Sequence, residues 1–117
     1  MPVGAFPLSD PNLKWFVVYT KHLTERKVAE RLKQLGFEVY LPLYTTIKQW
    51  SDRKKKIEKP LIASVVFVRT SPQALNNIFA AVGVSRVLKH LGQPAVVQDT
   101  EINNLRILLQ EVHHAEL

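Results

Sequence analysis

The sequence contains no cysteine, and this absence excludes several kinds of site. Without a thiol there is no disulfide framework, no thiolate zinc site and no cysteine nucleophile, and such a chain suits a reducing compartment. The 117 residues also include only four glycines, none of them clustered, so a glycine-rich phosphate loop is absent. We therefore expect a cytoplasmic protein that has no phosphate-loop nucleotide site.

Long hydrophobic runs are also missing. No segment approaches the roughly eighteen apolar residues of a membrane span, and the first fourteen residues lack both the basic segment and the apolar core of a signal peptide. We expect no membrane partner. The length predicts one domain with its own core, over residues 14–117, preceded by a proline-rich flexible arm over residues 1–13.

Groups for catalysis are scarce. The four histidines are scattered, and the adjacent His113 and His114 would point about 100° apart on a helix, so they cannot both face one metal. Asp52 and Glu58 stand among lysines, which makes them local ion partners rather than paired general acids. No hydrolase or metalloprotease motif occurs. We expect no enzyme activity, no metal and no cofactor.

The most informative stretch, residues 48–68, joins a basic segment to an apolar strand. The chain carries a net charge of +6, and between residues 48 and 59 six basic residues stand against two acidic ones, a local +4. Clustered charge of this kind can meet phosphates, although a solvated loop explains it equally well on charge alone. We expect a nucleic-acid contact from Arg53, Lys54, Lys55 and Lys56. Trp50 either stacks on an exposed base or pins the base of this hairpin to the body.

Hydrophobic periodicity predicts alternating strands and helices. Helices are expected over residues 22–35, from Ser71-Pro72 to Gly83, and from Asp99 or Thr100 onward, because each has a helical apolar stripe with a cap or stop residue. Strands are expected over residues 15–20, 37–41, 44–50, 57–60, 61–68 and 84–88, with a few extended residues at 95–97. This order predicts an α+β fold, an α/β plait of the ferredoxin-like type: an antiparallel sheet with helices mainly on one face, and a basic hairpin.

Two of these strands, residues 15–20 and 61–68, are apolar on both faces, so both sides of the sheet must be covered. Two interpretations remain open for the second side. The last helix and the N-terminal arm cover it, or a partner protein does, and a second copy of the chain is one such partner.

Several ordered blocks resemble the N-terminal domain of the NusG family of transcription factors. They are WFVVYTK at 15–21, VAERL at 28–32 and GFEVYLP at 36–42. The blocks QWSDRKKKIEKPL at 49–61, SVVFV at 64–68 and GVSRVLKHLGQPAVV at 83–97 are similar to the RfaH-like and UpxY-like antiterminator branch. The resemblance covers residues 14 to about 112. Ile62-Ala63-Ser64-Val65 stands where family members carry an aromatic-Pro-Gly-Tyr type of segment.

The resemblance implies a factor for transcription elongation or antitermination that suppresses pausing or termination. It implies binding to the β′ clamp helices of RNA polymerase through an apolar patch, which would be Tyr19, Ile62, Val65 and Phe67. Lys21 and the basic hairpin would lie toward DNA, at the non-template strand and the upstream fork. No KOW domain follows in the sequence, so contacts with a ribosome or a termination factor would need such a domain. The alternative is a free-standing basic nucleic-acid-binding plait domain.

Overall fold

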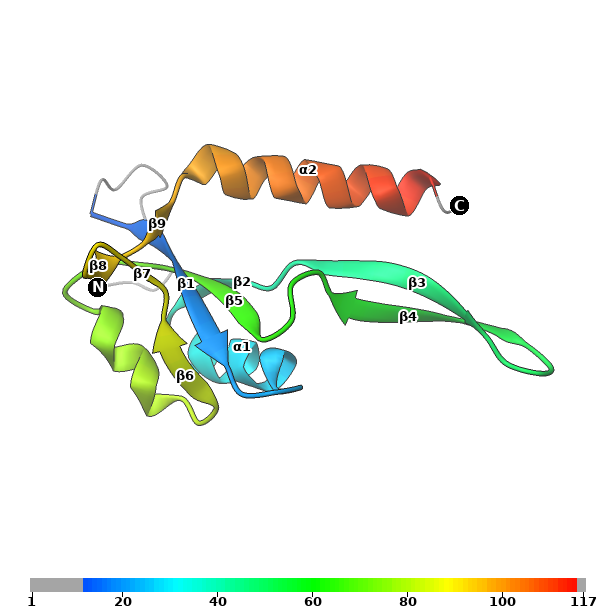
Figure 1. Cartoon of the computed structure of the whole chain (residues 1–117), viewed down its shortest axis with the longest axis horizontal. Helices are drawn as coiled ribbons and strands as arrows, with labels where there is room; N and C mark the ends of the chain where they lie inside the picture. The colour runs from blue at the N-terminus through cyan, green and yellow to red at the C-terminus, as the bar shows by residue number, and fades with distance from the viewer. Residues whose placement is uncertain (1–11, 116–117) are drawn as a thin grey trace.

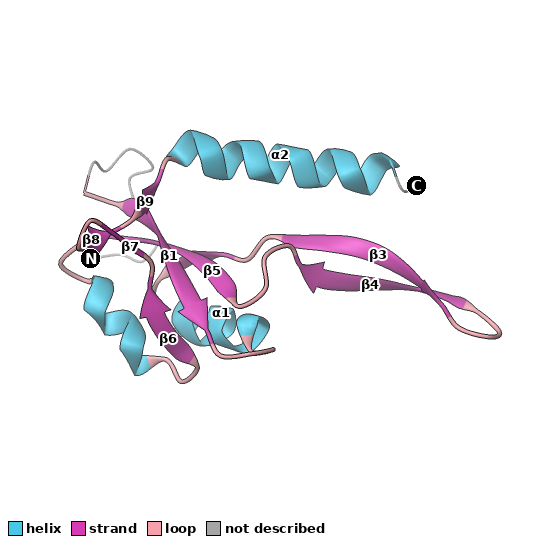
Figure 2. Cartoon of the chain, in the orientation of Figure 1, coloured by secondary structure: helices cyan, strands magenta, loops and turns pink. Residues whose placement is uncertain are grey.

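The computed structural model describes residues 12–115, with side chains to residue 110, so most of the predicted arm lies outside the described residues. Figures 1 and 2 show a mixed α/β arrangement with two long extensions. The elements are β1 Lys14–Thr20, α1 Glu25–Gln34, β2 Glu38–Tyr40, β3 Leu43–Gln49, β4 Lys54–Pro60, β5 Val65–Thr70, the 3-10 helix η1 Leu75–Ala80, β6 Val84–Val87, β7 Lys89–His90, β8 Gln93–Pro94, β9 Val96–Val97 and α2 Asp99–Ala115.

The central sheet has the strand order β2-β5-β1-β6, and every pairing in it is antiparallel. β9 also pairs with β1, beside Trp15 and Phe16, whereas β6 pairs with the other end of the same edge at Val18 to Thr20. β1 and β5 are therefore the central strands, as their apolar sequences predict. The coarser expectation of an α+β protein with an antiparallel sheet is confirmed.

Side-chain alternation divides β1 and β5 between two hydrophobic clusters. Phe16 and Val18 of β1 face α1 and η1, together with Val66 and Val68 of β5. These four side chains are at most 1% exposed. The helices contribute Val28, Ala29, Leu32, Leu75 and Ile78 to the same cluster. One face of the sheet is thus closed by the two helices that connect its strands.

The opposite face is covered by the start of α2. Trp15 and Val17 of β1 pack with Val65 and Phe67 of β5 and with Ile102 of α2, which is 1% exposed. Of the two interpretations left open by the sequence, the structure shows the last helix packed on this face through Ile102. α1 and η1 thus lie on one face of the sheet, and the start of α2 lies on the other.

Helix α1 ends as its sequence predicts. Gly36 has φ of +97°, its N–H donates to the Lys33 carbonyl at 3.0 Å, and the Phe37 N–H donates to the Leu32 carbonyl at 3.1 Å. This pair of bonds satisfies carbonyls that the helix leaves open, and it needs the left-handed residue that glycine supplies. The chain then enters β2 at the edge of the sheet.

The predicted strand over residues 61–68 is wrong at its start. Leu61 to Ser64 form a turn, with φ of +62° at Ser64, and the strand runs over Val65–Thr70 instead. The Ser64 N–H donates to the buried Glu25 carboxylate at 2.7 Å, and the Thr20 N–H donates to the Ser64 carbonyl at 2.9 Å. Apolar composition alone could not show this turn, because it is fixed by contacts with β1 and α1.

The helix predicted after Ser71-Pro72 is a 3-10 helix. The Ala74 N–H donates to Ser71 Oγ at 3.2 Å, so the capping contact is present. Leu75, Ile78 and Ala81 then recur every three residues, and each is at most 4% exposed. A period of three is that of a 3-10 helix. Phe79 therefore points outward, and it is 51% exposed although it belongs to the predicted helical stripe.

Strands β3 and β4 form a separate two-stranded sheet that extends away from the central sheet (Figure 2). The whole chain measures 52 × 34 × 28 Å along its principal axes, which reflects this projection and that of α2. Within residues 12–115, no helix combines the length and hydrophobicity that a membrane crossing requires.

Candidate functional site

The expected apolar patch is divided between exposed and buried side chains. Ile62 is 42% exposed, and its neighbour Leu61 is 40% exposed, in the turn before β5. Tyr19, in β1, is half-buried, and the Arg86 guanidinium lies 4.3 Å from its ring centroid. Cation–π contact of this kind holds an aromatic ring in place at a protein surface.

Val65 and Phe67, the other two residues of the expected patch, are only 5% and 7% exposed. The Phe67 ring stacks on Tyr40 of β2, with ring centroids 6.3 Å apart and planes at 25°. Ile102 of α2 packs in the same cluster. The structure thus brings Val65 and Phe67 together beneath α2, while Tyr19 and Ile62 remain accessible beside them.

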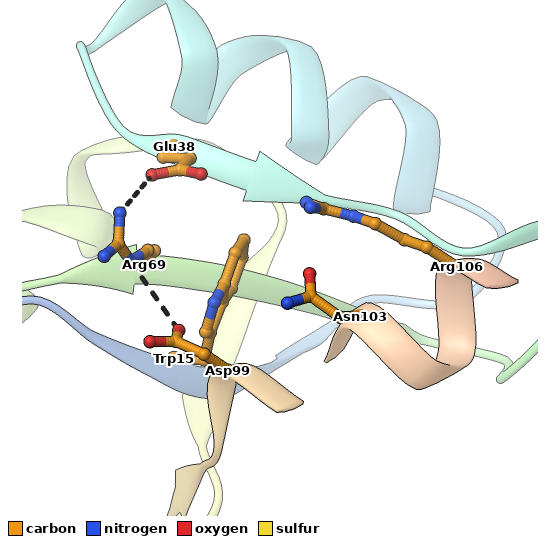
Figure 3. A pocket seen from close by; sticks show the side chains of 6 residues that line it. All are labelled: Trp15, Glu38, Arg69, Asp99, Asn103 and Arg106. Carbon is orange, nitrogen blue, oxygen red and sulfur yellow. Dashed lines mark hydrogen bonds and ion pairs between the residues drawn. The ribbon is translucent and has the colours of Figure 1, made fainter. Parts of the chain in front are cut away.

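Polar contacts fasten the start of α2 to the sheet (Figure 3). Arg69 of β5 lies 3.2 Å from Glu38 Oε1, and its Nε lies 3.9 Å from Asp99 Oδ1 at the first residue of α2. Arg106, two turns further along α2, lies 4.7 Å from the centroid of the Tyr40 ring and 5.8 Å from that of Trp15. These groups surround a cavity of about 260 Å³ lined by Trp15, Glu38, Arg69, Asp99, Asn103 and Arg106.

The partly buried Tyr40 shows how this environment acts on a titratable group. Burial raises the pKa of the Tyr40 hydroxyl above its ordinary value of 10.0, and the positive charge of Arg106 opposes part of that rise. The neutral phenol is therefore the form that the folded protein favours. A neutral ring also suits its stacking against Phe67.

The basic hairpin is an extended ribbon with a half-buried base and an exposed tip. Its register pairs Leu43 with Pro60 at the base and Gln49 with Lys54 at the tip, without a shift. The Leu61 N–H donates to the Pro42 carbonyl at 2.9 Å and closes the base. Arg26 of α1 donates from Nη2 to the Glu58 carbonyl at 2.8 Å, which ties the hairpin to the body.

Trp50 lies in the turn at the tip, where its N–H donates to the Arg53 carbonyl at 2.7 Å. Its side chain is 48% exposed, and Lys48 Nζ lies 5.1 Å from the ring centroid. The interpretation that Trp50 pins the base of the hairpin to the body does not fit this position. The exposed ring is compatible with the other interpretation, in which Trp50 stacks on a base.

The four basic residues expected to act together do not share one surface. Because side chains alternate along a strand, Lys54 and Lys56 lie on one face of the ribbon, and Lys55 lies on the other. Arg53 stands in the turn. A continuous run of basic residues in the sequence hides this division, which the period of two along a strand imposes.

Lys21, the remaining residue expected to contact DNA, follows β1 directly and its side chain is exposed. Its N–H donates to the Gly83 carbonyl at 2.9 Å, and Thr24 Oγ1 donates to its carbonyl at 2.7 Å. These contacts fix the backbone of Lys21 at the end of the sheet. It belongs to the body of the protein and not to the hairpin.

Sequence reasoning did not single out Arg86, Arg69 or Arg106, each of which organises the surfaces described above. The register of Arg86 opposite Tyr19 depends on strand pairing, for which the sequence carried no local signal. Among the residues that the structure describes, no group of three or more acidic or histidine side chains is placed to hold a metal ion.

Comparison with known proteins finds a family model and solved structures that are similar to this chain. A family model described as "Transcription termination factor nusG" matches residues 13–106. Among solved structures, the chain is similar to one described as "Domain interaction in Thermotoga maritima NusG", with a TM-score of 0.50 and 26% sequence identity. The similarity covers 80% of this chain and 55% of that one, so this chain spans little more than half its length. No curated protein sequence gives a match.

Proposed function

Since the chain belongs to the NusG family, we propose that it acts as a transcription elongation or antitermination factor that binds RNA polymerase and suppresses pausing or termination. The observation that carries this proposal is the family match over residues 13–106, which extends from the start of the sheet into α2. The strand order β2-β5-β1-β6 supports assigning the sheet to the α/β plait. Membership of the RfaH-like and UpxY-like branch is part of the same proposal.

The docking surface for the β′ clamp helices is proposed to be the patch of Tyr19, Ile62, Val65 and Phe67. Tyr19 and Ile62 supply the accessible contacts, while Val65 and Phe67 form the floor under α2. Such a factor closes the polymerase clamp only by binding the closed state more tightly than the open one. The arrangement supports a helical partner that lies across the turn at Leu61 and Ile62.

This docking surface is tested by co-purification with core RNA polymerase, with and without a competing clamp-helix peptide. Ile62→Asp places a charge in the proposed interface without entering the core, so retention should fall at least about tenfold. Phe79→Asp is the matched control, because Phe79 is similarly exposed at 51% but lies on η1, against the opposite face of the sheet. Equal retention of both variants would reject the patch.

Contact with DNA is proposed for Lys21, Trp50, Arg53, Lys54, Lys55 and Lys56. Within the described part of the chain, none of the hairpin cations in this set forms an ion pair, which supports a role toward an external anion. Replacing residues 53–56 with serine should flatten the log-log salt dependence of DNA binding, by up to about 0.7–0.9 for each phosphate that is no longer neutralised. An unchanged slope would leave the hairpin as a solvated loop.

A second candidate function, a free-standing nucleic-acid-binding domain, is favoured by the same exposed hairpin. The two candidate functions are distinguished by comparing how the parent chain and the variant with residues 53–56 replaced bind core polymerase. A polymerase factor retains binding to core polymerase when residues 53–56 are replaced, because its apolar patch is intact. A free-standing nucleic-acid-binding domain shows no retention on core polymerase in either form.

A further inference from the structure

The hairpin tip places an exposed indole beside two lysines that face each other across the strands. Lys48 of β3 is registered directly opposite Lys55 of β4, so both side chains leave the same face of the ribbon. Trp50 follows in the turn, and its ring lies beside Lys48, whose Nζ is 5.1 Å from the ring centroid. One face of the tip therefore gathers one aromatic ring and two ammonium groups.

The opposition of Lys48 and Lys55 is unfavourable for the isolated protein. Like charges directly opposite each other on neighbouring strands destabilise the pairing. Among the described residues, neither lysine forms an ion pair: the acidic Glu58 belongs to the other face of the ribbon, opposite Thr45, and Asp52 lies in the turn beyond both strands. An anion bound between the two lysines would relieve their repulsion. The site thus favours a ligand that carries a negative charge next to a flat ring.

We propose that Trp50, Lys48 and Lys55 form a binding site for an unpaired nucleotide of a single strand. The base stacks on the Trp50 indole, and the Lys48 and Lys55 ammonium groups hold its phosphate. Stacking requires a base whose face is open, which a paired base inside a duplex does not offer. This inference rests on the proposed contact of the hairpin with nucleic acid, and it names the strand state and the face that are used.

The opposite face of the ribbon provides the contrast. Lys54 lies opposite Gln49, and Lys56 lies opposite Ile47, so that face carries two lysines that do not oppose each other. No tryptophan belongs to it, because the chain has only two and Trp15 is 3% exposed in the core. Lys56 attracts nucleic acid through charge alone. Lys55 and Lys56 therefore differ in surroundings while matching in residue type, charge and strand.

The experiment uses the whole chain and three probes of about twelve units: oligo(dT), oligo(U) and a DNA duplex. The variants are Trp50→Leu, Lys48→Gln and Lys55→Gln, with Lys56→Gln as the matched control. Affinity is measured by titration, and stacking is measured by quenching of tryptophan fluorescence. Circular dichroism checks the fold, which these exposed positions should leave intact.

Trp50→Leu is expected to weaken oligo(dT) binding about five- to hundredfold, to abolish the quenching and to leave duplex binding unchanged. Lys55→Gln and Lys48→Gln should each weaken single-strand binding more than Lys56→Gln does. Weakened binding of both oligo(dT) and oligo(U) by Trp50→Leu shows that base stacking does not distinguish the two sugars. A loss confined to one probe identifies the strand that the site prefers.

The inference is overturned if Trp50→Leu leaves single-strand affinity and quenching unchanged, or if Lys55→Gln and Lys56→Gln weaken binding equally. Those results would leave a hairpin that attracts nucleic acid through charge without a defined site. Failure of the proposed DNA contact itself is a different result: no variant, including replacement of all of residues 53–56, then changes the binding of any probe.

Discussion

Gly83, the residue before β6, lies close to Val28 of α1. It has φ of +102°, and a Cβ atom there would lie 2.7 Å from Val28 Cγ2. Gly92 also has a positive φ, of +80°, but a Cβ there would meet nothing within 4 Å. A comparison of alanine substitutions at the two glycines therefore distinguishes the cost of a positive φ, which both share, from steric crowding, which only Gly83 has.

Gly83→Ala is expected to lower the free energy of unfolding by about 1–3 kcal/mol more than Gly92→Ala does, because only the first substitution overpacks the core. Both carry the cost of a positive φ, about 1–2 kcal/mol. Urea unfolding of the two variants and the parent protein measures the difference. Equal losses would mean that Val28 moves aside without cost.

The raised pKa of Tyr40 leads us to expect a lower free energy of unfolding in alkali. Burial raises its folded-state pKa above 10.0, so its contribution is complete below about pH 10 and is lost as pH rises through the folded-state pKa. As pH rises above about 10, the free energy of unfolding should fall more steeply for the parent than for Tyr40→Phe. All other residues are the same in the two proteins, so the difference between the two profiles reports on the Tyr40 hydroxyl. Parallel pH profiles would contradict the assignment.

Helix α2 determines which part of the sheet a partner can reach. Its start is packed through Ile102 and tied by Arg69 to Asp99, while Ile107 is 53% exposed. The sheet residues Val65 and Phe67 are consequently part of the core of the free protein. A charged substitution at Phe67 is expected to unfold the protein instead of testing its docking surface.

The two isoleucines of α2 give a matched test of this packing. Ile102→Ala should cost about 2–5 kcal/mol of unfolding free energy, since it removes a side chain that is 1% exposed. Ile107→Ala, on the same helix but 53% exposed, should change it by no more than about 0.5 kcal/mol. Chemical denaturation measures both. Similar small losses would show that α2 does not seal the sheet.

The elements were predictable where a local rule decides them. Double-sided apolar patterns identified β1 and β5 as central strands, and Gly36 identified the end of α1. Local rules do not decide the type of helix at residues 75–80, because Leu75 and Ile78 fit the spacing of an α-helix and of a 3-10 helix equally. Only the packing of the folded protein selects the 3-10 helix. The turn at Leu61 to Ser64 depends on Glu25, which is distant in sequence.

The candidate site was predictable in composition but not in arrangement. Trp50 and the lysines were identified from clustered charge, while their division between two faces follows from the β3–β4 register. The sequence showed that the second face of the sheet is buried. The apolar stripe of the last helix, however, does not show which surface that helix packs against. The cover by α2 and the contacts of Arg86 and Arg106 therefore required the structure.

The molecule as a whole is expected to be a monomer. A homodimer was one explanation for the second apolar face of the sheet, but α2 already covers the centre of that face. Sedimentation equilibrium should return the chain mass of 13.4 kDa at micromolar concentration. A mass near twice this value would show that another surface, such as the exposed side of α2, associates with itself.

The bond from Arg26 to the Glu58 carbonyl makes the hairpin and the apolar patch parts of one body. When one surface is engaged on a large assembly, the other is presented to its own target at an effective concentration of order millimolar. Two linked contacts of this kind would raise the overall affinity about 10²–10⁴-fold over either contact alone. If both proposed contacts form, either one can release and rebind while the other keeps the protein attached.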